Sequence, residues 1–373
     1  MNSLEVRKKT ITNIHESEFK FVIVSSGGGS NAIGSLLKVP GASNSILEAY
    51  IPYAKESLDF YLMKKPESYC SLDTTTRMAA RAYSAAKKID QKTNIEQLFG
   101  VAISATLSTN YEKKGSHRFH IAVQTRDFSQ SISCILNKGQ RTREEEEELV
   151  TEFVIALISD CCGFEFKYPE IKEDVEHIQI PAQKGWADLM SEKIKFVTSS
   201  NQQPKLIFPG AFNPMHDGHI AMSELANKEL SEEVFFEICI QNVDKPPLSY
   251  HQIKKTIDQF TDSKNWVLTK AGKFSDKAKL FPNSTFIIGA DTLVRIFDER
   301  FYASRREMME EFEIFNVNNN NFLVFGREYK NKFIELNDIQ VPDSIKSRFR
   351  GFGENIFRKD VSSSTIRAQN SEE

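Results

Sequence analysis

The feature that most restricts the fold of this chain is a regular alternation of strand-like and helix-like segments after residue 204. Short apolar runs read KLIFP, VFFEICI, NWVLTKA, TFIIGA and NFLVFG, and helix-like stretches such as HIAMSELANKEL separate them. Strands that alternate with helices favour a parallel sheet covered by helices on both faces. We therefore expect a doubly wound α/β domain over residues 205–373, with its ligand beyond the carboxyl ends of the strands.

The first half of the chain predicts a separate α/β domain over residues 20–163. An apolar strand, FKFVIV, leads through SSGGGS into a helical stretch, and a longer helix is expected over Thr74–Ile89. Two further strands are expected, over Phe99–Ser104 and Phe119–Thr125. Residues 164–204 then read as a connector that ends in the polar stretch SSNQQP. A chain of 373 residues is long enough for two such domains.

A run of acidic residues, TREEEEE, follows Arg141 and begins another predicted helix. Carboxylates in the first turns of a helix are favoured by the helix dipole. We interpret the run as a solvated helix start and assign it no binding role.

Composition excludes some classes of partner. The formal net charge of −3 argues against a polycationic chain that binds nucleic acid by bulk electrostatics. The sequence has no apolar run of the roughly 20 residues that cross a bilayer, and its first residues lack the apolar core of a secretory signal. The five cysteines are scattered without CxxC spacing, which favours buried thiols over a metal or redox role. We therefore expect a cytoplasmic protein that binds neither membrane nor nucleic acid.

The most informative motif is GAFNPMHDGHI, over Gly210–Ile220, where a predicted strand ends and a helix begins. His216 and His219 are three residues apart, so both imidazoles can face one space at the helix N-terminus. Such a terminus attracts phosphate through its free N–H groups, and Gly218 leaves room for a large anion. A histidine pair could instead bind a metal, but the motif supplies no third ligand.

A second motif, KDVSSSTIRAQ, lies near the end of the chain. Ser363 and Ser364 stand at a predicted helix start, and Arg367, about one turn further, can contact phosphate oxygens with its guanidinium. An isolated serine cluster of this kind is also a common helix cap. Together with the first motif it predicts two anion-binding helix N-termini in one sheet domain, as a polyphosphate requires.

These residues carry a family resemblance. GAFNPMHDGH resembles the GxFxPxHxGH motif, and VSSSTIR the ISSTxIR motif, of the HxGH-motif nucleotidylyltransferase superfamily. Between them, FIIGADTLVRIF is similar to the GxDxL element of nicotinamide and nicotinate mononucleotide adenylyltransferases. The resemblance implies a Rossmann-like fold and transfer of a nucleotidyl group from Mg²⁺-bound ATP or CTP to a phosphate-bearing acceptor, with release of pyrophosphate.

The resemblance also implies roles for individual residues. His216, His219 and Arg367 would act in catalysis by contacting the triphosphate. The other expected nucleotide-binding residues are Gly210, Ala211, Phe212, Gly218, Gly289, Asp291, Ser363 and Ser364, with Lys245 and Arg327 as additional phosphate cations. A plain helix cap remains an alternative for Asp291, and a surface position remains one for Lys245 and Arg327.

One departure from the adenylyltransferase pattern concerns the acceptor. Those families usually carry a tryptophan shortly after the GxDxL element, where it stacks on the pyridine ring. Here the stretch reads IFDERFY, so Phe297, Phe301 or Tyr302 would have to substitute.

The first half has its own resemblance. VSSGGGSNAI, VPGASNSILEAYIPY and GVAISATLST are similar, in that order, to the C-terminal domain of the CinA family, whose enzymatic members deamidate nicotinamide mononucleotide. Ser43 falls on the position of the proposed nucleophile and Tyr53 on a downstream tyrosine, but Leu58 stands where a lysine is expected. Deamidation is therefore doubtful, and SSGGGS is either a phosphate- or ribose-facing loop or a turn required by packing. Such domains also make a homodimer reasonable.

The sequence thus predicts an ATP-dependent mononucleotide adenylyltransferase, acting on nicotinamide mononucleotide, joined to a CinA-like domain. One alternative keeps the transfer but uses CTP or another acceptor. Another is a protein that senses a nucleotide without turnover.

Overall fold

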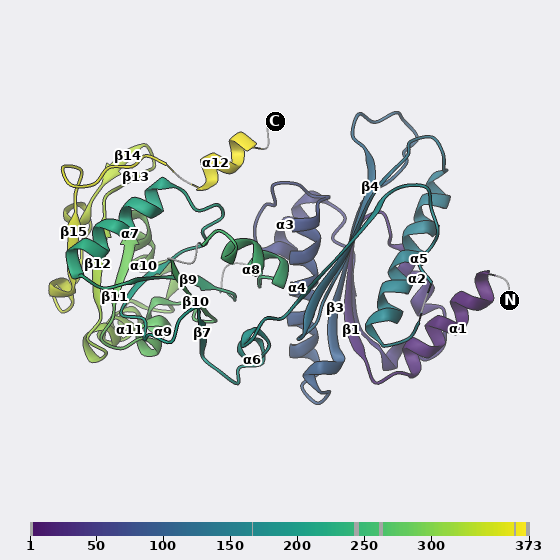
Figure 1. Ribbon diagram of the computed structural model, residues 1–373, viewed down its shortest axis with the longest axis horizontal. Helices are drawn as coiled ribbons and strands as arrows, with labels where there is room; N and C mark the ends of the chain where they lie inside the picture. The colour runs from purple at the N-terminus through teal and green to yellow at the C-terminus, as the bar shows by residue number, and fades with distance from the viewer. Residues whose placement is uncertain (1–2, 166, 242–245, 261–263, 362, 371–373) are drawn as a thin grey trace. The chain divides into compact units, whose positions relative to one another are not determined.

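The computed structural model describes residues 3–165, 167–241, 246–260, 264–361 and 363–370 (Figure 1). The chain divides into two compact units. Unit 1 comprises Met1–Ser191 and Asp244–Lys254, and unit 2 comprises Glu192–Val243 and Lys255–Glu373. The division falls inside the segment 164–204 that the sequence marks as a connector, and a short piece of the second half of the chain belongs to unit 1.

Unit 1 is built on a six-stranded mixed sheet in the order β2-β1-β3-β4-β5-β6. The first three strands in this order run parallel, and the last three continue as antiparallel neighbours. In chain order the strands are β1 Lys20–Gly27, β2 Ile46–Tyr50, β3 Leu98–Thr106, β4 His117–Gln124, β5 Phe128–Leu136 and β6 Val175–Pro181. The sequence patterns predicted β1, β3 and β4, whereas β2 and β5 lacked a recognised signal.

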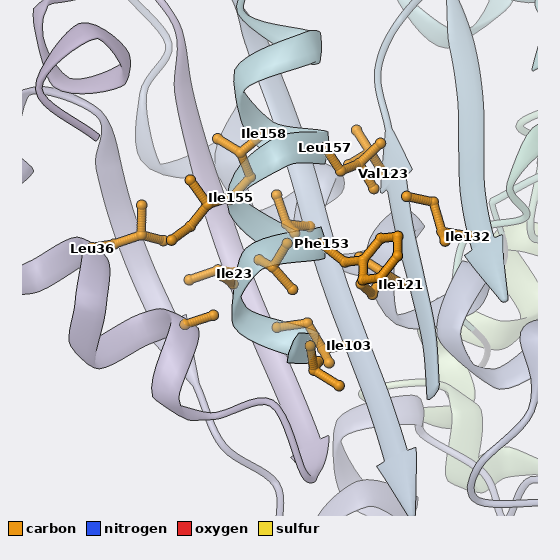
Figure 2. Packing of buried hydrophobic residues seen from close by; sticks show 14 of the residues in the cluster. Ile23, Leu36, Ile103, Ile121, Val123, Ile132, Phe153, Ile155, Leu157 and Ile158 are labelled. Atoms are coloured by element: carbon orange, nitrogen blue, oxygen red, sulfur yellow. The ribbon is translucent and has the colours of Figure 1, made fainter. Parts of the chain in front are cut away.

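Helices cover both faces of this sheet. One face carries α1 (Ser3–Glu16), α2 (Asn31–Leu37) and α5 (Arg143–Cys161), and the other carries α3 (Lys55–Leu62) and α4 (Leu72–Ile89). Figure 2 shows the α5 side, where Phe153 and its apolar neighbours on α5 pack against isoleucines and valines of the strands. Two separate apolar clusters, one on each face, therefore hold the unit together.

Gly100 explains how closely α4 lies on the sheet. A Cβ atom at Gly100 would stand 2.1 Å from the backbone N of Tyr83 and 2.3 Å from the carbonyl O of Ala79. Only glycine can occupy this position on β3, because the atoms it would meet are backbone atoms of α4.

The acidic run does begin a helix, but not a wholly solvated one. Thr142 and Glu145 form a capping box at the start of α5, as the helix prediction requires. Glu146, however, is fully buried and accepts hydrogen bonds from the backbone N of Ser108 at 2.6 Å and from Nδ1 of His117 at 2.8 Å. The interpretation of the run as solvent-facing is therefore wrong at this residue, because a carboxylate with two donors can be buried.

The piece of unit 1 that comes from later in the sequence is held by specific contacts. Tyr250 is buried against Trp186, with ring centroids 5.6 Å apart, and its backbone N donates to Oγ of Ser129 at 3.0 Å. Gln252 donates to Oγ1 of Thr76 at 2.6 Å. Helix α6, which carries Trp186, spans Trp186–Met190, and helix α8 spans Tyr250–Ile257, so α8 begins in unit 1 and ends in unit 2.

Unit 2 contains a seven-stranded sheet in the order β15-β12-β11-β8-β9-β10-β7. Six strands are parallel, and only β7 runs antiparallel, beside β10. The strands are β7 Phe196–Thr198, β8 Leu206–Pro209, β9 Val234–Cys239, β10 Asn265–Thr269, β11 Thr285–Gly289, β12 Asn321–Phe325 and β15 Phe349–Phe352, with a separate hairpin of β13 Arg327–Tyr329 and β14 Lys332–Ile334. The predicted Rossmann-like doubly wound sheet is confirmed, and its strand order reverses between β8 and β11, where such folds bind ligands.

Phenylalanines build much of the core of unit 2. One face of the sheet packs against α9 (Phe274–Leu280), α10 (Ala290–Ile296) and α11 (Arg305–Val317). The buried residues of this cluster include Phe235, Phe281, Phe286, Phe312, Phe315 and Phe322. Helix α7 (Asp217–Leu230) contacts β9 and β11, and α12 (Ser363–Asn370) follows the last strand. Part of the chain's high phenylalanine content, 28 residues in all, therefore serves this core.

None of the helices in the described part of the chain combines the length and the apolar character needed to cross a membrane. All five cysteines are free thiols.

Candidate active site

The loop after β8 is shaped by the ring of Phe212. This residue has a φ of 43°, and its buried ring packs edge-on against Phe208 and Phe236. A Cβ atom at Gly210 would stand 2.5 Å from that ring. Gly210 therefore makes room for a side chain of the loop itself, and Ala211, the remaining predicted loop residue before Phe212, is exposed.

The two histidines of the motif lie together at the start of α7. Their rings stack with centroids 3.7 Å apart. The backbone N of His216 donates to Nδ1 of His219 at 3.3 Å, so a neutral His219 carries its proton on Nε2. His216 is 7% exposed, and neither of its ring nitrogens has a hydrogen-bond partner among the described residues. A buried polar group without a partner is costly unless a ligand supplies one.

Burial keeps both histidines neutral in the ligand-free protein. It lowers the pKa of His219 to about 3, with further lowering from His216 and Arg327. It also lowers the pKa of His216, helped by Arg327 and opposed by Asp217. Neutral imidazoles in this place can donate to an anion, and they gain a proton more readily once an anion is bound.

Arg327 follows β12, where its charge acts on both histidines, and it pairs with Asp291 in the first turn of α10. The Arg327 Nε lies 3.9 Å from Oδ1 of Asp291, an oxygen that is buried and has no hydrogen-bond partner among the described residues. A Cβ atom at Gly289 would stand 2.4 Å from the same oxygen. Gly289 therefore gives space to the Asp291 carboxylate, and Arg327 lies between this carboxylate and the recess lined by Gly218.

The C-terminal motif reaches the loop after β8. Oγ of Ser363 donates to the carbonyl O of Pro214 at 2.8 Å, and Nη1 of Arg367 donates to the carbonyl O of Asn213. The structure thus brings Ser363 and Arg367 to the histidine loop and shows them holding its backbone. Lys245 lies outside the described residues, and so does the side chain of Ser364.

A pocket opens beside the histidine helix and adds residues that the sequence patterns did not single out. Its lining includes Gly218 and Met222 of α7, the apolar side chains of Phe325 and Phe357, and the cations Arg327 and Lys359. Lys359 is the first residue of the motif KDVSSSTIRAQ. Its positive charge at this position is the sequence signal that could have marked it as a phosphate contact. The recess thus brings apolar side chains and two cations together beside the histidine helix.

The three aromatic residues that could replace the missing tryptophan differ in how deeply they are buried. Phe297 packs in the core against Phe312 and Phe349, at centroid distances of 5.0 and 5.9 Å. Tyr302 also packs on Phe312, and its hydroxyl donates to the carbonyl O of Ile296 at 2.8 Å. Phe301 is 48% exposed. Of the three, Phe301 is the side chain that a ligand could reach without repacking the core.

The two expected site residues of unit 1 are both exposed. Ser43 is exposed in a short 3-10 helix, and Tyr53 is 67% exposed. Two residues after Ser43, the Oγ of Ser45 lies 2.6 Å from Nδ1 of His15. Both residues are buried, and Nε2 of His15 bonds the carbonyl O of Leu36, so the pair fastens α1 to the unit.

The glycines of SSGGGS are explained by packing. A Cβ atom at Gly27 would stand 2.1 Å from the carbonyl O of Ala105, and one at Gly29 would stand 2.6 Å from Ile103. The backbone N of Gly29 donates to the Glu147 carboxylate at 2.6 Å. An internal carboxylate therefore takes a donor that a phosphate-binding loop would offer to its ligand.

No group of three or more His, Cys, Asp or Glu side chains within the described ranges is placed to hold a metal ion.

Comparison with protein families assigns unit 2 to a class. Residues 207–369 match the family described as cytidylyltransferase-like, so this part of the chain is a cytidylyltransferase-like, nucleotidyltransferase-type domain. The match confirms the resemblance carried by the HxGH and serine motifs. No curated protein matches the chain.

Solved structures are also similar to parts of the chain. The N-terminal part is similar to the competence or damage-inducible protein from Enterobacter asburiae, with 14% identity, a TM-score of 0.36, and coverage of 43% of this chain and 99% of that one. A CinA superfamily protein from Klebsiella pneumoniae matches at 13% identity and a TM-score of 0.35, covering 44% and 99%. Plasmodium falciparum nicotinic acid mononucleotide adenylyltransferase, complexed with NaAD, matches at 18% identity and a TM-score of 0.25, covering 40% and 72%.

Proposed function

We propose that unit 2 transfers an adenylyl group from Mg²⁺-bound ATP to nicotinamide mononucleotide, forming NAD and pyrophosphate. The observation that carries the proposal is the state of the His216 ring. The ring is buried at the start of α7 and stacks on His219, and neither of its nitrogens has a hydrogen-bond partner among the described residues. Such a group is prepared for an anion, and the helix N-terminus attracts the same charge.

The reaction needs positioning and charge stabilisation more than covalent chemistry. A phosphate oxygen of the acceptor attacks the α-phosphorus in line, the bond to the bridging oxygen breaks, and pyrophosphate leaves with that oxygen's electrons. Nε2–H of His219 and the ring of His216 are proposed to donate to the phosphate oxygens as negative charge develops. Arg327 and Lys359, which line the adjacent pocket, would neutralise the leaving group.

Mg²⁺ enters this account as part of the substrate. The ion usually keeps several waters and binds through phosphates and one or two carboxylates. The Asp291 carboxylate, whose Oδ1 is buried and has no hydrogen-bond partner among the described residues, would suit such a contact. Arg327 would then contact the phosphate oxygens of the polyphosphate, and Asp291 would contact the Mg²⁺ bound to them.

The choice of base and acceptor rests on the sequence resemblance. The GxDxL element, with Gly289 and Asp291, supports a pyridine mononucleotide as acceptor. The family that unit 2 matches is described as cytidylyltransferase-like, which favours CTP with a phosphoalcohol as the second candidate. No activity is proposed for unit 1, since Ser43 is exposed and the backbone N–H of Gly29 already donates to the Glu147 carboxylate.

A panel assay separates these possibilities. The purified protein is incubated with Mg²⁺ and either ATP or CTP, each with nicotinamide mononucleotide, nicotinate mononucleotide or a phosphoalcohol, and pyrophosphate release is measured. We expect release with ATP and nicotinamide mononucleotide. Release with CTP alone would replace the proposal by its rival, and nucleotide binding without release from any pair would indicate a sensor.

A further inference from the structure

The loop that presents His216 is held by side chains at four consecutive backbone positions. The carbonyl oxygens of Asn213 and Pro214 accept from Arg367 and Ser363, as described above. The two outer positions, Phe212 and Met215, are both held by one residue, Gln259. Its Nε2 donates to the carbonyl O of Phe212 at 2.9 Å, and its Oε1 accepts from the backbone N of Met215 at 2.9 Å.

Gln259 is well suited to fix the width of this loop. A carboxamide has its donor and acceptor in one plane at a fixed separation, so two bonds from one amide set the distance between Phe212 O and Met215 N. The amide is itself oriented, because Nε2 also contacts the carbonyl oxygens of Thr256 and Lys255 at 3.3 and 3.4 Å. The loop therefore depends on a side chain more than 40 residues away in the sequence.

The next residue reinforces the same contact. The ring of Phe260 lies 5.8 Å from that of Phe212 and 5.1 Å from that of Phe236. Gln259 thus holds the backbone of Phe212 while Phe260 packs against its ring. A non-glycine residue with a positive φ, such as Phe212 at 43°, persists only when its surroundings hold it in place.

The geometry matters because Met215 directly precedes His216. A displacement of about 1 Å at a positioning residue can cost ~100-fold in rate. If Met215 N loses its acceptor, the start of α7 can shift, and the stacked histidine pair shifts with it.

We infer that Gln259 is a positioning residue for nucleotidyl transfer, which sets the histidine pair by bridging Phe212 and Met215. This inference rests on the proposed function, since it assigns Gln259 a part in that reaction. Gln259 itself touches neither substrate nor reacting atoms.

The test compares Gln259→Ala and Gln259→Glu with Lys255→Ala, a change at an exposed side chain one turn earlier. Pyrophosphate release gives kcat and KM for ATP, thermal melting reports folding, and hydrogen–deuterium exchange reports the peptide over residues 211–217. Gln259→Ala should lower kcat about 10- to 100-fold with little change in KM. It should also speed the exchange of this peptide, while the melting temperature stays near that of Lys255→Ala.

Gln259→Glu supplies a readout that a general structural role would not move. An ionised carboxylate still accepts from Met215 N but repels the carbonyl O of Phe212, whereas a protonated one restores both bonds. The activity of Gln259→Glu relative to the wild type should therefore rise as the pH is lowered from 7 to 5.5.

The outcomes separate the two claims. If Gln259→Ala retains the wild-type kcat and exchange, the inference is overturned while the proposed function stands. If the wild type releases no pyrophosphate with any pair of the panel, the proposed function fails. In that case faster exchange in Gln259→Ala still upholds the loop bridge, and unchanged exchange overturns it.

Discussion

The backbone N of His216 donates to Nδ1 of His219, and the two imidazole rings stack with centroids 3.7 Å apart. This bond places the proton of a neutral His219 on Nε2, and the stack keeps both rings at the N-terminus of α7. Because the two histidines are three residues apart in the sequence, their ring N–H groups lie on the same side of the N-terminus of α7. This arrangement is the geometric basis of the proposed chemistry.

A first prediction concerns pH. Because burial lowers the pKa of His219 to about 3, the folded protein leaves this ring neutral at pH 5, while the unfolded chain takes up a proton below about pH 6.5. Its contribution to stability is thus fully present above pH 6.5 and is lost as the pH falls. From pH 7 to 5 the loss should be about 1 to 2 kcal/mol of the free energy of unfolding.

Denaturant unfolding at both pH values measures this loss. The comparison with His219→Asn cancels the contribution of other titrating groups. Equal losses in the two proteins would show that the His219 pKa is not depressed.

A second prediction concerns the buried acid of unit 1. Glu146→Ala removes the acceptor of Ser108 N and His117, leaving a half-buried amide and a buried imidazole without their partner. It should lower the free energy of unfolding by about 3 kcal/mol. Glu144→Ala, two residues earlier on the exposed side, should change it by less than about 0.5 kcal/mol. Similar effects of the two substitutions, measured by denaturant unfolding, would argue against a buried role for Glu146.

A third prediction uses two glycines of unit 1. Gly100→Ala should cost about 3 kcal/mol or more, because the new Cβ meets backbone atoms of α4 that cannot move aside. Gly34→Ala is the matched control: a Cβ there meets nothing within 4 Å, and alanine favours the helix by about 0.5 to 1 kcal/mol. Thermal melting should separate the two variants in opposite directions from the wild type, and a stable Gly100→Ala would contradict the close packing of α4.

A fourth prediction concerns the Asp291 carboxylate. Gly289→Ala places a Cβ 2.4 Å from Oδ1 of Asp291, so the carboxylate must move. We expect the loss of pyrophosphate-release activity in Gly289→Ala to be about as large as that in Asp291→Ala. The double variant should then be no worse than either single one, because both changes remove the same group. Additive losses would show that Gly289 acts independently of Asp291.

Sequence patterns predicted the parts of the fold whose signals are local. The alternation after residue 204 predicted the doubly wound sheet, and the loop-to-helix motif predicted the meeting of His216 and His219. The buried state of Glu146 was missed, since its partner His117 lies on another strand and a charge run usually faces solvent. Gln259 carried no local signal at all, because its importance comes only from tertiary hydrogen bonds to Phe212 and Met215.

The most direct test of the account is product formation from Mg·ATP and nicotinamide mononucleotide by the wild type and by His219→Ala, measured as NAD and pyrophosphate in equal amounts. The wild type should form both products. His219→Ala should do so about 100- to 1,000-fold more slowly, because it lacks one donor to the developing charge. ATP binding by the wild type without formation of either product would contradict the account.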